Sequence, residues 1–435
     1  MKNDPIKFIN TLDFARSLDA DDALARFRNL YYIPRKSQRE VVYLTGNSLG
    51  LLPRDTFTHL ERELFDWASL GVDGHFRAKN PWVSYHERLT SPLATIVGAK
   101  TQEVVAMNSL TVNLHLLLVS FYRPTKQRFK VICEYRPFPS DRYALDSQIR
   151  FHGLDPAEAL VELKPRAGEH CLRTEDILAT IREHADTLAL VMMGGVNFIT
   201  GQAFDMQAIT KETHACGAIA GFDLAHAIGN IPLALHDWNV DFACWCSYKY
   251  LNSGPGGVGG VFIHERNLND PKIPRFNGWW GGDPKKKFLM ADEFSPAPTA
   301  EAWQLSNAPV LSMSAHHTAL NLFEEAGMAQ LRKKSLLLTA YLEFLIQDID
   351  NKYFKGEEIL EIITPADPEQ RGCQLSIKAH GLGRELFDAL EECGVVADWR
   401  EPDVIRMAPV PMYNSFEDVW LVWTSLDYIL KKKHK

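Results

Sequence analysis

Apolar residues between positions 100 and 270 fall into short runs that alternate with segments of helical spacing. Six of these runs have the length and composition of strands. They lie at 104–107, 130–133, 188–192, 218–222, 240–245 and 261–263. Strands that alternate with helices form parallel sheets covered on both faces, so the pattern predicts an α/β fold with a mainly parallel central sheet.

The pattern differs on either side of this region. Before it, helical spacing at 19–30 and 55–69 flanks a short apolar strand at 41–44 and a small polar turn at 46–50. After it, helical spacing covers 315–349 and 383–393, with a strand at 373–377. A chain of 435 residues is long for one core. We expect an N-terminal segment, 1–70, that packs on both domains, a large α/β domain, 71–310, and a small C-terminal α+β domain, 311–435.

Two polar residues follow predicted strands directly. Asp223 ends the run at 218–222, and Lys249 comes shortly after the run at 240–245. Ligands of open α/β sheets gather at the carboxyl ends of the strands. Pyridoxal phosphate needs an amine for a Schiff base and a carboxylate for its pyridinium nitrogen. Each residue alone has an ordinary explanation, a surface lysine or a capping aspartate, and His226 could be a core histidine, but the combination favours this cofactor.

Further segments suit such a cofactor. Thr111 stands where a strand turns into a helix, and helix N-termini bind phosphate, although an ordinary N-cap explains Thr111 equally well. Phe138 follows the strand at 130–133 and could stack on a pyridine ring or belong to the core; Ser140 and Asp141 beside it are also candidate cofactor residues. The glycine-rich run at 254–260 precedes a strand rather than a helix, which favours a tight turn over a dinucleotide-binding loop.

Arg406 lies in an apolar, strand-like segment and needs an anionic partner there. A substrate carboxylate suits the bidentate geometry of a guanidinium, and an internal salt bridge is an equal alternative.

Charge and cysteine content narrow the class of protein. The net charge is −8, and the basic clusters at 285–287 and 431–435 are short, so we expect no nucleic-acid partner. Seven scattered cysteines, without a second Cys or His pair near Cys244 and Cys246, indicate reduced thiols and no metal site. No apolar run approaches ~20 residues and no export signal is present, so we expect a cytoplasmic enzyme that spans no membrane.

Several motifs together resemble the kynureninase family. They are GNSLG at 46–50, LTVNLH at 110–115, GFDLAH at 221–226, HDW at 236–238 and SYKYLN at 247–252, and residues 406–416 resemble the C-terminal signature of that family. The resemblance implies the fold-type I, class V aminotransferase-like architecture of pyridoxal phosphate enzymes and a homodimer whose active sites are shared between subunits. It also implies hydrolysis of L-kynurenine, or of 3-hydroxykynurenine, to anthranilate, or 3-hydroxyanthranilate, and L-alanine.

The resemblance assigns roles by position. Lys249 is implied as the Schiff-base lysine that then moves the α-proton, Asp223 as the partner of the pyridinium, His226 as a support beside the cofactor and Phe138 as the stacking ring. Tyr248 is implied in phosphate binding, and we expect it also to transfer protons, with a phenol acidified by nearby cations. The other implied phosphate-binding residues are Leu110 and Thr111, with Trp279 and Asn307 across the interface. The implied substrate residues are Ser48, His75, Trp280, Asn307 and Arg406, the last for the α-carboxylate.

Two departures and two rivals limit this reading. Gly194 stands where some family members have serine, and 282–284 read GDP where several relatives have His-Glu. A cysteine desulfurase-like lyase or class V aminotransferase shares the Asp-x-x-His and lysine framework, with Cys171 and Cys373 as the only candidate mobile cysteines. A non-catalytic ligand sensor is the more distant rival. The sequence leaves open which of the two substrates is preferred, and whether the step serves tryptophan breakdown or nicotinamide cofactor synthesis.

Overall fold

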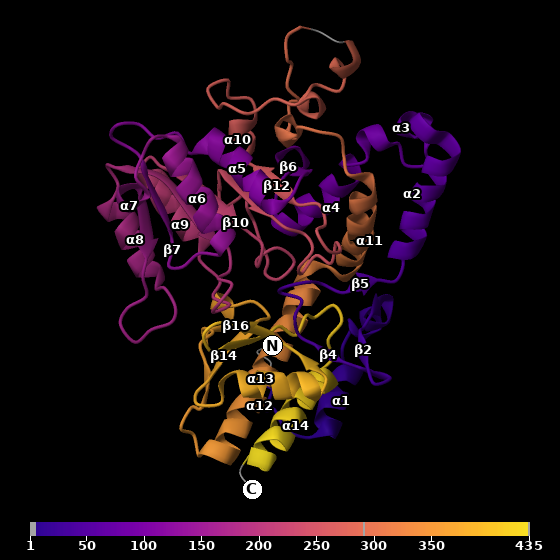
Figure 1. The fold of residues 1–435 in the computed structure, drawn as a ribbon, viewed down its shortest axis with the longest axis vertical. Helices are drawn as coiled ribbons and strands as arrows, with labels where there is room; N and C mark the ends of the chain where they lie inside the picture. Colours follow the sequence, from indigo (N-terminus) through magenta and orange to yellow (C-terminus); the bar gives the residue numbers. More distant parts are fainter. Residues whose placement is uncertain (1–5, 290–291, 434–435) are drawn as a thin grey trace. The chain divides into compact units, whose positions relative to one another are not determined.

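The computed structural model describes residues 6–289 and 292–433 (Figure 1). The chain forms two compact units. The smaller contains the residues up to Arg54, Ile199–Gln202 and the chain from Glu325 onward; the larger contains Asp55–Phe198 and Ala203–Glu324. The domain limits expected at 70 and 310 stay predictions. Of the basic cluster at 431–435, the last two residues lie outside the described part of the chain.

A seven-stranded sheet forms the centre of the larger unit, in the order β6-β12-β11-β10-β9-β7-β8. All neighbouring strands are parallel except those that flank β12, which is antiparallel to both β11 and β6. The mainly parallel sheet is therefore confirmed. The strands are β6 (Val104–Ala106), β7 (Lys130–Glu134), β8 (Leu160–Leu163), β9 (Leu188–Gly194), β10 (Ile219–Asp223), β11 (Phe242–Trp245) and β12 (Gly260–Ile263).

All six strands expected between positions 100 and 270 are present in this sheet, and of its seven strands the edge strand β8 was not predicted. Three of its four residues are half-buried, so it lacks the apolar run that marks the buried strands. The chain enters β12 from the glycine-rich run 254–260, where Gly254 and Gly256 have φ of +91° and +64°. Such angles are open to glycine at little cost, in agreement with a tight turn.

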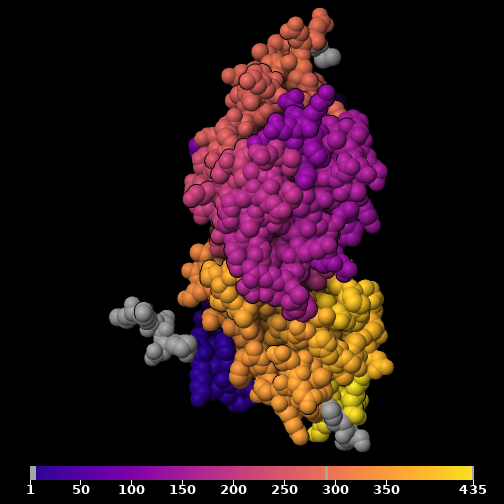
Figure 2. All heavy atoms as spheres, turned by 90° about the vertical axis from the view of Figure 1, so that its left-hand side faces the viewer, coloured from indigo at the N-terminus to yellow at the C-terminus, as the bar shows by residue number. Residues whose placement is uncertain are grey.

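Helices cover the sheet of the larger unit. The apolar core includes Phe121 of α5 stacked on Phe242 of β11, with ring centroids 4.7 Å apart. Figure 2 shows that the magenta part of the chain, which contains α7 and α8, forms the outer surface on the β8 side. The helices of this unit are α2 (Thr56–Leu70), α3 (Gly74–Arg77), α4 (Glu87–Val97), α5 (Leu110–Phe121), α6 (Pro139–Phe151), α7 (Pro156–Ala159), α8 (Thr174–Glu183), α9 (Met206–Ala215), α10 (Glu265–Leu268) and α11 (Val310–Ala326).

The smaller unit is α+β. Its four-stranded antiparallel sheet has the order β13-β14-β17-β16 and packs with the long helices in a second apolar core. Its helices are α1 (Leu12–Ala20), α12 (Met328–Phe354), α13 (Gly383–Glu392) and α14 (Phe416–Lys433). The strands of the sheet are β13 (Leu360–Ile362), β14 (Leu375–Ala379), β16 (Asp398–Arg400) and β17 (Val404–Met407). Short pairs join β1 (Tyr31–Tyr32) to β5 (Leu52–Pro53), β2 (Arg35–Lys36) to β3 (Arg39–Glu40), and β4 (Val42–Tyr43) to β15 (Val395–Val396).

Two helix predictions need correction. The segment expected as one helix at 19–30 is the end of α1 followed by a 3₁₀ helix, Ala25–Leu30. The helix expected at 315–349 is interrupted between α11 and α12 at Gly327, whose φ of +73° and ψ of 132° are not helical. Among the described residues, no helix has both the length and the apolar character needed to cross a bilayer.

Candidate active site

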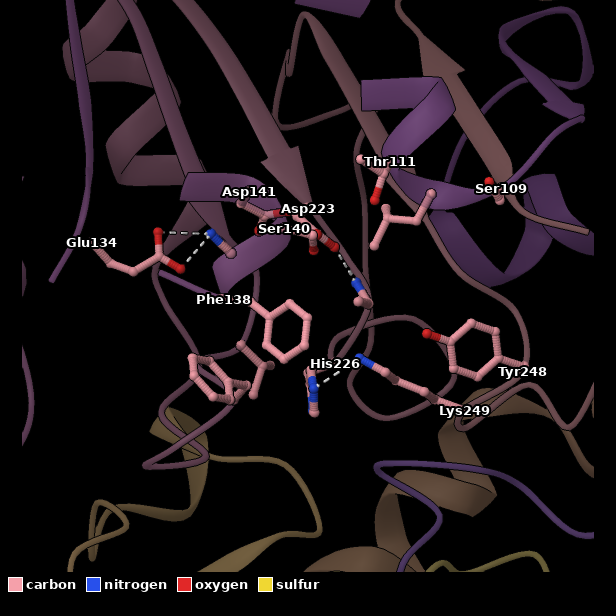
Figure 3. Close-up of a pocket in the computed structure, with 15 residues that line it drawn as sticks. Ser109, Thr111, Glu134, Phe138, Ser140, Asp141, Asp223, His226, Tyr248 and Lys249 are labelled. Carbon is pink, nitrogen blue, oxygen red and sulfur yellow. Dashed lines mark hydrogen bonds between the residues drawn. The ribbon is translucent and has the colours of Figure 1, made fainter. Parts of the chain in front are cut away.

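Nine of the candidate residues line one cavity of about 160 Å³ in the larger unit, at the carboxyl end of the parallel strands (Figure 3). The cavity is formed by the turns after β10 and β11 and by the first turns of α5 and α6. The structure therefore brings together residues that lie as far as 139 positions apart, from Leu110 to Lys249. The nine are Leu110, Thr111, Phe138, Ser140, Asp141, Asp223, His226, Tyr248 and Lys249.

Lys249 is the amine of this cavity. Its side chain is only 8% exposed, and its Nζ lies 3.0 Å from Nε2 of His226. The same Nζ lies 5.6 Å from the centre of the Phe138 ring. No carboxylate of the described residues forms an ion pair with it within 4.0 Å. A buried amine without a paired anion suits covalent chemistry with a carbonyl group better than a structural role.

Asp223 and Asp141 form the acidic end of the cavity. Asp223 is the last residue of β10, and its Oδ1 accepts a hydrogen bond from the Ala225 amide at 2.7 Å. Burial raises the pKa of Asp223, and the Ala225 amide, the charge of Lys249 and a hydrogen bond with Asp141 oppose that rise. Burial and the charges of Asp223 and Glu134 raise the pKa of Asp141 well above its ordinary value. The two aspartates therefore share a proton more readily than they both ionise.

The first turn of α5 forms the opposite wall. Asn108 has φ of +47°. Its side-chain Nδ2 donates to the side-chain Oδ1 of Asn113 at 3.1 Å, which fixes the turn from β6 into α5. Ser109 is the N-cap but makes no side-chain capping bond. The backbone N–H groups at the start of a helix have no partners within the helix, so those of α5 can bind an anion at the Ser109 to Thr111 wall.

Phe138 and Tyr248 supply the rings of the cavity. Phe138 is 37% exposed and meets the edge of Phe198 at 5.1 Å, so it is a wall of the cavity rather than a core residue. Burial and the neighbouring Cys246 raise the pKa of Tyr248. The expectation of an acidified phenol is therefore wrong, because no cation outweighs burial there. Tyr248 remains a protonated phenol, a donor of hydrogen bonds.

The other candidates of the larger unit lie outside this cavity. Nδ1 of His75 on α3 donates to the Val72 carbonyl oxygen, 3.0 Å away, and the His75 ring contacts Trp82. Trp280 is 2% exposed, under the ammonium of Lys287 at 4.4 Å, whereas Trp279 is 49% exposed. Asn307 is exposed and lines a second cavity of about 340 Å³, which shares Ser109 with the first.

Ser48 and Arg406 belong to the smaller unit. Arg406 is 1% exposed, and its Nη2 donates to Oδ2 of Asp398 at 2.6 Å, across the β16 and β17 pair. The internal salt bridge considered for Arg406 is thus present. A carboxylate-binding role of Arg406 stays a prediction, as does the role of Ser48.

Sequence reasoning did not assign several residues that line the cavity. Glu134 ends β7 as Asp223 ends β10, so a carboxylate at a strand end was the signal that could have found it. Gly194, which ends β9, had been noted only as a departure from the family pattern. The remaining lining residues are Ser109, Val196, Phe198 and Ala225.

Among the residues that the structure describes, two groups of side chains have the composition of a metal site. In the first, Glu103 already accepts from His236 Nδ1 at 2.9 Å and from the amides of Glu265 and Lys100 at 2.7 and 2.9 Å. This group links three segments by hydrogen bonds and has no need of an ion. The second comprises His86, Glu87 and Glu301, close to the ammonium charge of Lys287.

Two family models match the chain, Aminotransferase class-V over residues 42–365 and Kynureninase C-terminal domain over residues 331–426. A kynureninase of Flavobacterium psychrophilum is 53% identical over 425 residues, 98% of each chain. A kynureninase of Myxococcus xanthus is 54% identical over 417 residues, 96% of each chain. The chain belongs to the kynureninase family.

Solved structures of other members of the class V group share the fold. The apo cysteine desulfurase of Thermococcus onnurineus NA1 matches with a TM-score of 0.73 at 16% identity, over 90% of this chain and 95% of that one. The cysteine desulfurase CsdA of Escherichia coli matches with a TM-score of 0.74 at 15% identity, over 94% and 98%. At such identity the likeness shows the fold alone, which is the fold-type I architecture.

The cavity fits pyridoxal phosphate on its own geometry. Oδ1 of Asp141 is buried and has no hydrogen-bond partner, which leaves an acceptor for a donor that a bound group would bring. The cavity also holds the buried amine of Lys249, which has no anionic partner, and the N-terminus of α5. These are the groups that an aldehyde and a phosphate need.

Proposed function

We propose that this enzyme uses pyridoxal phosphate to hydrolyse the side chain of L-kynurenine, or of 3-hydroxykynurenine, to anthranilate, or 3-hydroxyanthranilate, and L-alanine. The observation that carries the proposal is the buried Lys249 amine, without an anionic partner, in the same cavity as Asp223, in a chain about half identical to kynureninases over 98% of its length. It is a hydrolase of carbon–carbon bonds in ketones.

The chain's residues divide the work of the reaction. When bound, pyridoxal phosphate supplies an electron-withdrawing ring that stabilises negative charge on the carbon chain of the substrate. Asp223 would pair with the ring nitrogen, and Phe138 would stack on the ring. The first turn of α5 would hold the phosphate through Leu110 and Thr111.

Proton movement falls to Lys249 and Tyr248. Lys249, as a free amine, removes the α-proton of the substrate, and His226, 3.0 Å from its Nζ, orients the amine. Tyr248 donates a proton from its neutral phenol to a developing negative charge. Burial raises its pKa, so the phenol is protonated at neutral pH, the form that a proton donor needs.

Substrate recognition is assigned to residues outside the cofactor cavity. Arg406 binds the α-carboxylate while Asp398 orients its guanidinium from the neighbouring strand. Trp280 forms a wall for the aryl ring, and His75, Asn307 and Ser48 complete the substrate site. These roles rest on the resemblance of the chain to the kynureninase family.

We also propose that the enzyme is a homodimer with shared active sites, in which Trp279 and Asn307 reach the phosphate of the partner. The support is helix α2, in which the usual pattern of burial is reversed: its buried residues are the polar Thr56 and Glu63. Its apolar residues are exposed instead: Phe57 by 61%, Phe65 by 68% and Trp67 by 60%. A contiguous apolar face of this kind marks a protein interface. The helix lies on the outer side of its unit, beyond α11 (Figure 1).

We propose that the enzyme is located in the cytoplasm. The seven cysteines are all free thiols, which suits a reducing compartment.

The experiment is to mix the purified, cofactor-loaded enzyme with L-kynurenine and, separately, with 3-hydroxykynurenine, and to follow the fluorescent anthranilates and alanine. Product from either compound supports the proposal, and the ratio of rates gives the preference. The variant Lys249→Ala should form no product, whereas Lys211→Ala, an exposed lysine on α9, should match the unaltered enzyme. Alanine formed from cysteine, with no product from either kynurenine, would favour the desulfurase alternative, for which Cys373 is poorly placed because it is 1% exposed.

A further inference from the structure

Glu134 is a carboxyl group of the cavity with no evident structural duty. It ends β7, is 4% exposed and forms no ion pair among the described residues. Its Oε1 and Oε2 accept from the Gly194 amide at 3.1 and 3.2 Å (Figure 3), and its own backbone amide also stabilises the carboxylate. A buried carboxyl group held by backbone amides and without a cationic partner is costly to keep, which points to a role in the site.

Gly194 makes room for this carboxyl group. A Cβ atom at position 194 would lie 2.9 Å from Oε1 of Glu134, closer than real Cβ contacts. Glycine at 194 and glutamate at 134 are therefore matched, and a side chain at 194 would displace the carboxyl group. The space that Glu134 needs therefore explains why glycine stands at position 194, where the sequence departs from the family pattern.

Glu134 interacts electrostatically with the aspartate pair. Burial raises the pKa of Glu134 to about 7, the Gly194 amide lowers it, and the charge of Asp223 raises it further. Its own charge in turn raises the pKa of Asp141. The titratable groups that surround this wall are Asp141 on α6, Asp223 on β10, His226 and Lys249 in the turns, Cys133 on β7 itself, and, further out, Arg142 paired with Glu162 of β8.

We propose that Glu134 is a positioning residue of the cofactor site, which acts through Asp141 and Asp223 to set how firmly the ring nitrogen of the bound cofactor holds its proton. The inference rests on the proposed function only in requiring that pyridoxal phosphate binds here. An ionised Glu134 adds negative charge to the acidic end of the cavity, so the protons shared by the aspartates and the ring nitrogen are held to higher pH. With a neutral side chain at position 134, these protons would dissociate at lower pH.

The test is a spectral pH titration of the cofactor-loaded enzyme without substrate. The midpoint at which the absorption spectrum of the bound cofactor changes should fall by about one pH unit in Glu134→Gln, the size expected for one charge at this range in a protein. The control Glu158→Gln, an exposed residue on α7, should leave the midpoint in place. An unchanged midpoint in Glu134→Gln, or an equal shift in the control, overturns the proposal.

A second variant separates charge from packing. Gly194→Ala keeps the charge but displaces the carboxyl group, so it should also move the midpoint, and should add nothing in the Glu134→Gln background. A full additional shift in the double variant would mean that position 194 acts through the backbone, and the proposal would fall. Because no substrate is used, these results stand apart from the kynurenine assay: absence of hydrolysis leaves the titration readable, and failure to bind pyridoxal phosphate at all refutes both proposals together.

Discussion

Burial and the neighbouring Cys246 thiol oppose the ionisation of Tyr248 and raise its pKa. Replacing Tyr248 with Phe removes the donor and leaves the ring. We expect turnover to fall by ~10²-fold or more, the usual share of a general acid, with the cofactor still bound.

Turnover number and the absorption of the bound cofactor test this expectation together. Tyr143→Phe, at a 68% exposed position on α6, is the control. Unchanged turnover in Tyr248→Phe would end the proposed role, and loss of the cofactor signal would reassign Tyr248 to binding.

At the scale of single residues, the site was partly predictable. Asp223 and Lys249 could be placed at one edge because both follow apolar strands. The partner of Arg406 could not, since Asp398 meets it only through the register of β16 against β17. The pKa of Tyr248 could not either, because burial is a property of the folded chain.

Among the elements, β11 is anchored at its start by Asp241. This carboxylate accepts from His214 at 2.7 Å, Arg266 at 2.6 Å and the Ala220 amide at 2.8 Å. Burial opposes its ionisation, but these partners together hold its pKa below the ordinary 3.8. A carboxylate with a lowered pKa stabilises the fold above its unfolded pKa, and that stability is lost as pH falls through the folded value.

We therefore expect Asp241→Asn to lower the free energy of unfolding by ~3 kcal/mol at pH 7, the cost of breaking a buried pair. The difference from the unaltered enzyme should shrink below about pH 4, where Asp241 of the unfolded chain takes up a proton, and go on shrinking as pH falls through the lower pKa of the folded state. Denaturant unfolding at several pH values measures it, with the exposed Asp237→Asn as control. A difference that is constant down to pH 3 would contradict the assignment.

The break between α11 and α12 gives a second prediction for an element. Gly327 has φ of +73° and open space around its missing Cβ, so Gly327→Ala meets backbone strain without a clash. We expect a loss of ~1–3 kcal/mol in unfolding free energy. Gln330→Ala on the same helix should cost little, and an equally stable Gly327→Ala would show that the junction can adopt another backbone conformation.

The same junction shows a limit of predicting helices from the spacing of apolar residues. A lone glycine is tolerated inside many helices, so the spacing at 315–349 gave no warning of a positive φ at Gly327. Strand β8 escaped notice for a related reason, since an edge strand needs no continuous apolar run. The buried strands of the sheet were predicted because burial on both faces demands such runs.

For the whole molecule, the exposed face of α2 predicts the assembly. Phe65→Glu should convert the dimer to a single chain in sedimentation experiments, because a charge replaces a 68% exposed ring on that face. Cofactor affinity should fall with it, since Trp279 and Asn307 are proposed to act across the interface.

Phe151→Glu, at a 78% exposed position on α6, is the matched control and should leave the mass unchanged. An unaltered enzyme that sediments as a single chain would refute the proposed dimer. The sequence motifs implied a dimer, but the inverted polarity of α2, with Glu63 inside and Phe65 outside, became visible only once the helix was folded.

The distribution of thiols has a practical consequence. Of the seven cysteines, Cys393 in the smaller unit is exposed, Cys171 and Cys216 are partly buried, and Cys133 and Cys244 are buried in the central sheet of the larger unit. A maleimide dye added briefly to the native enzyme should therefore label Cys393 first. The slow labelling of Cys133 and Cys244, resolved by peptide mass, would then record how often the central sheet opens.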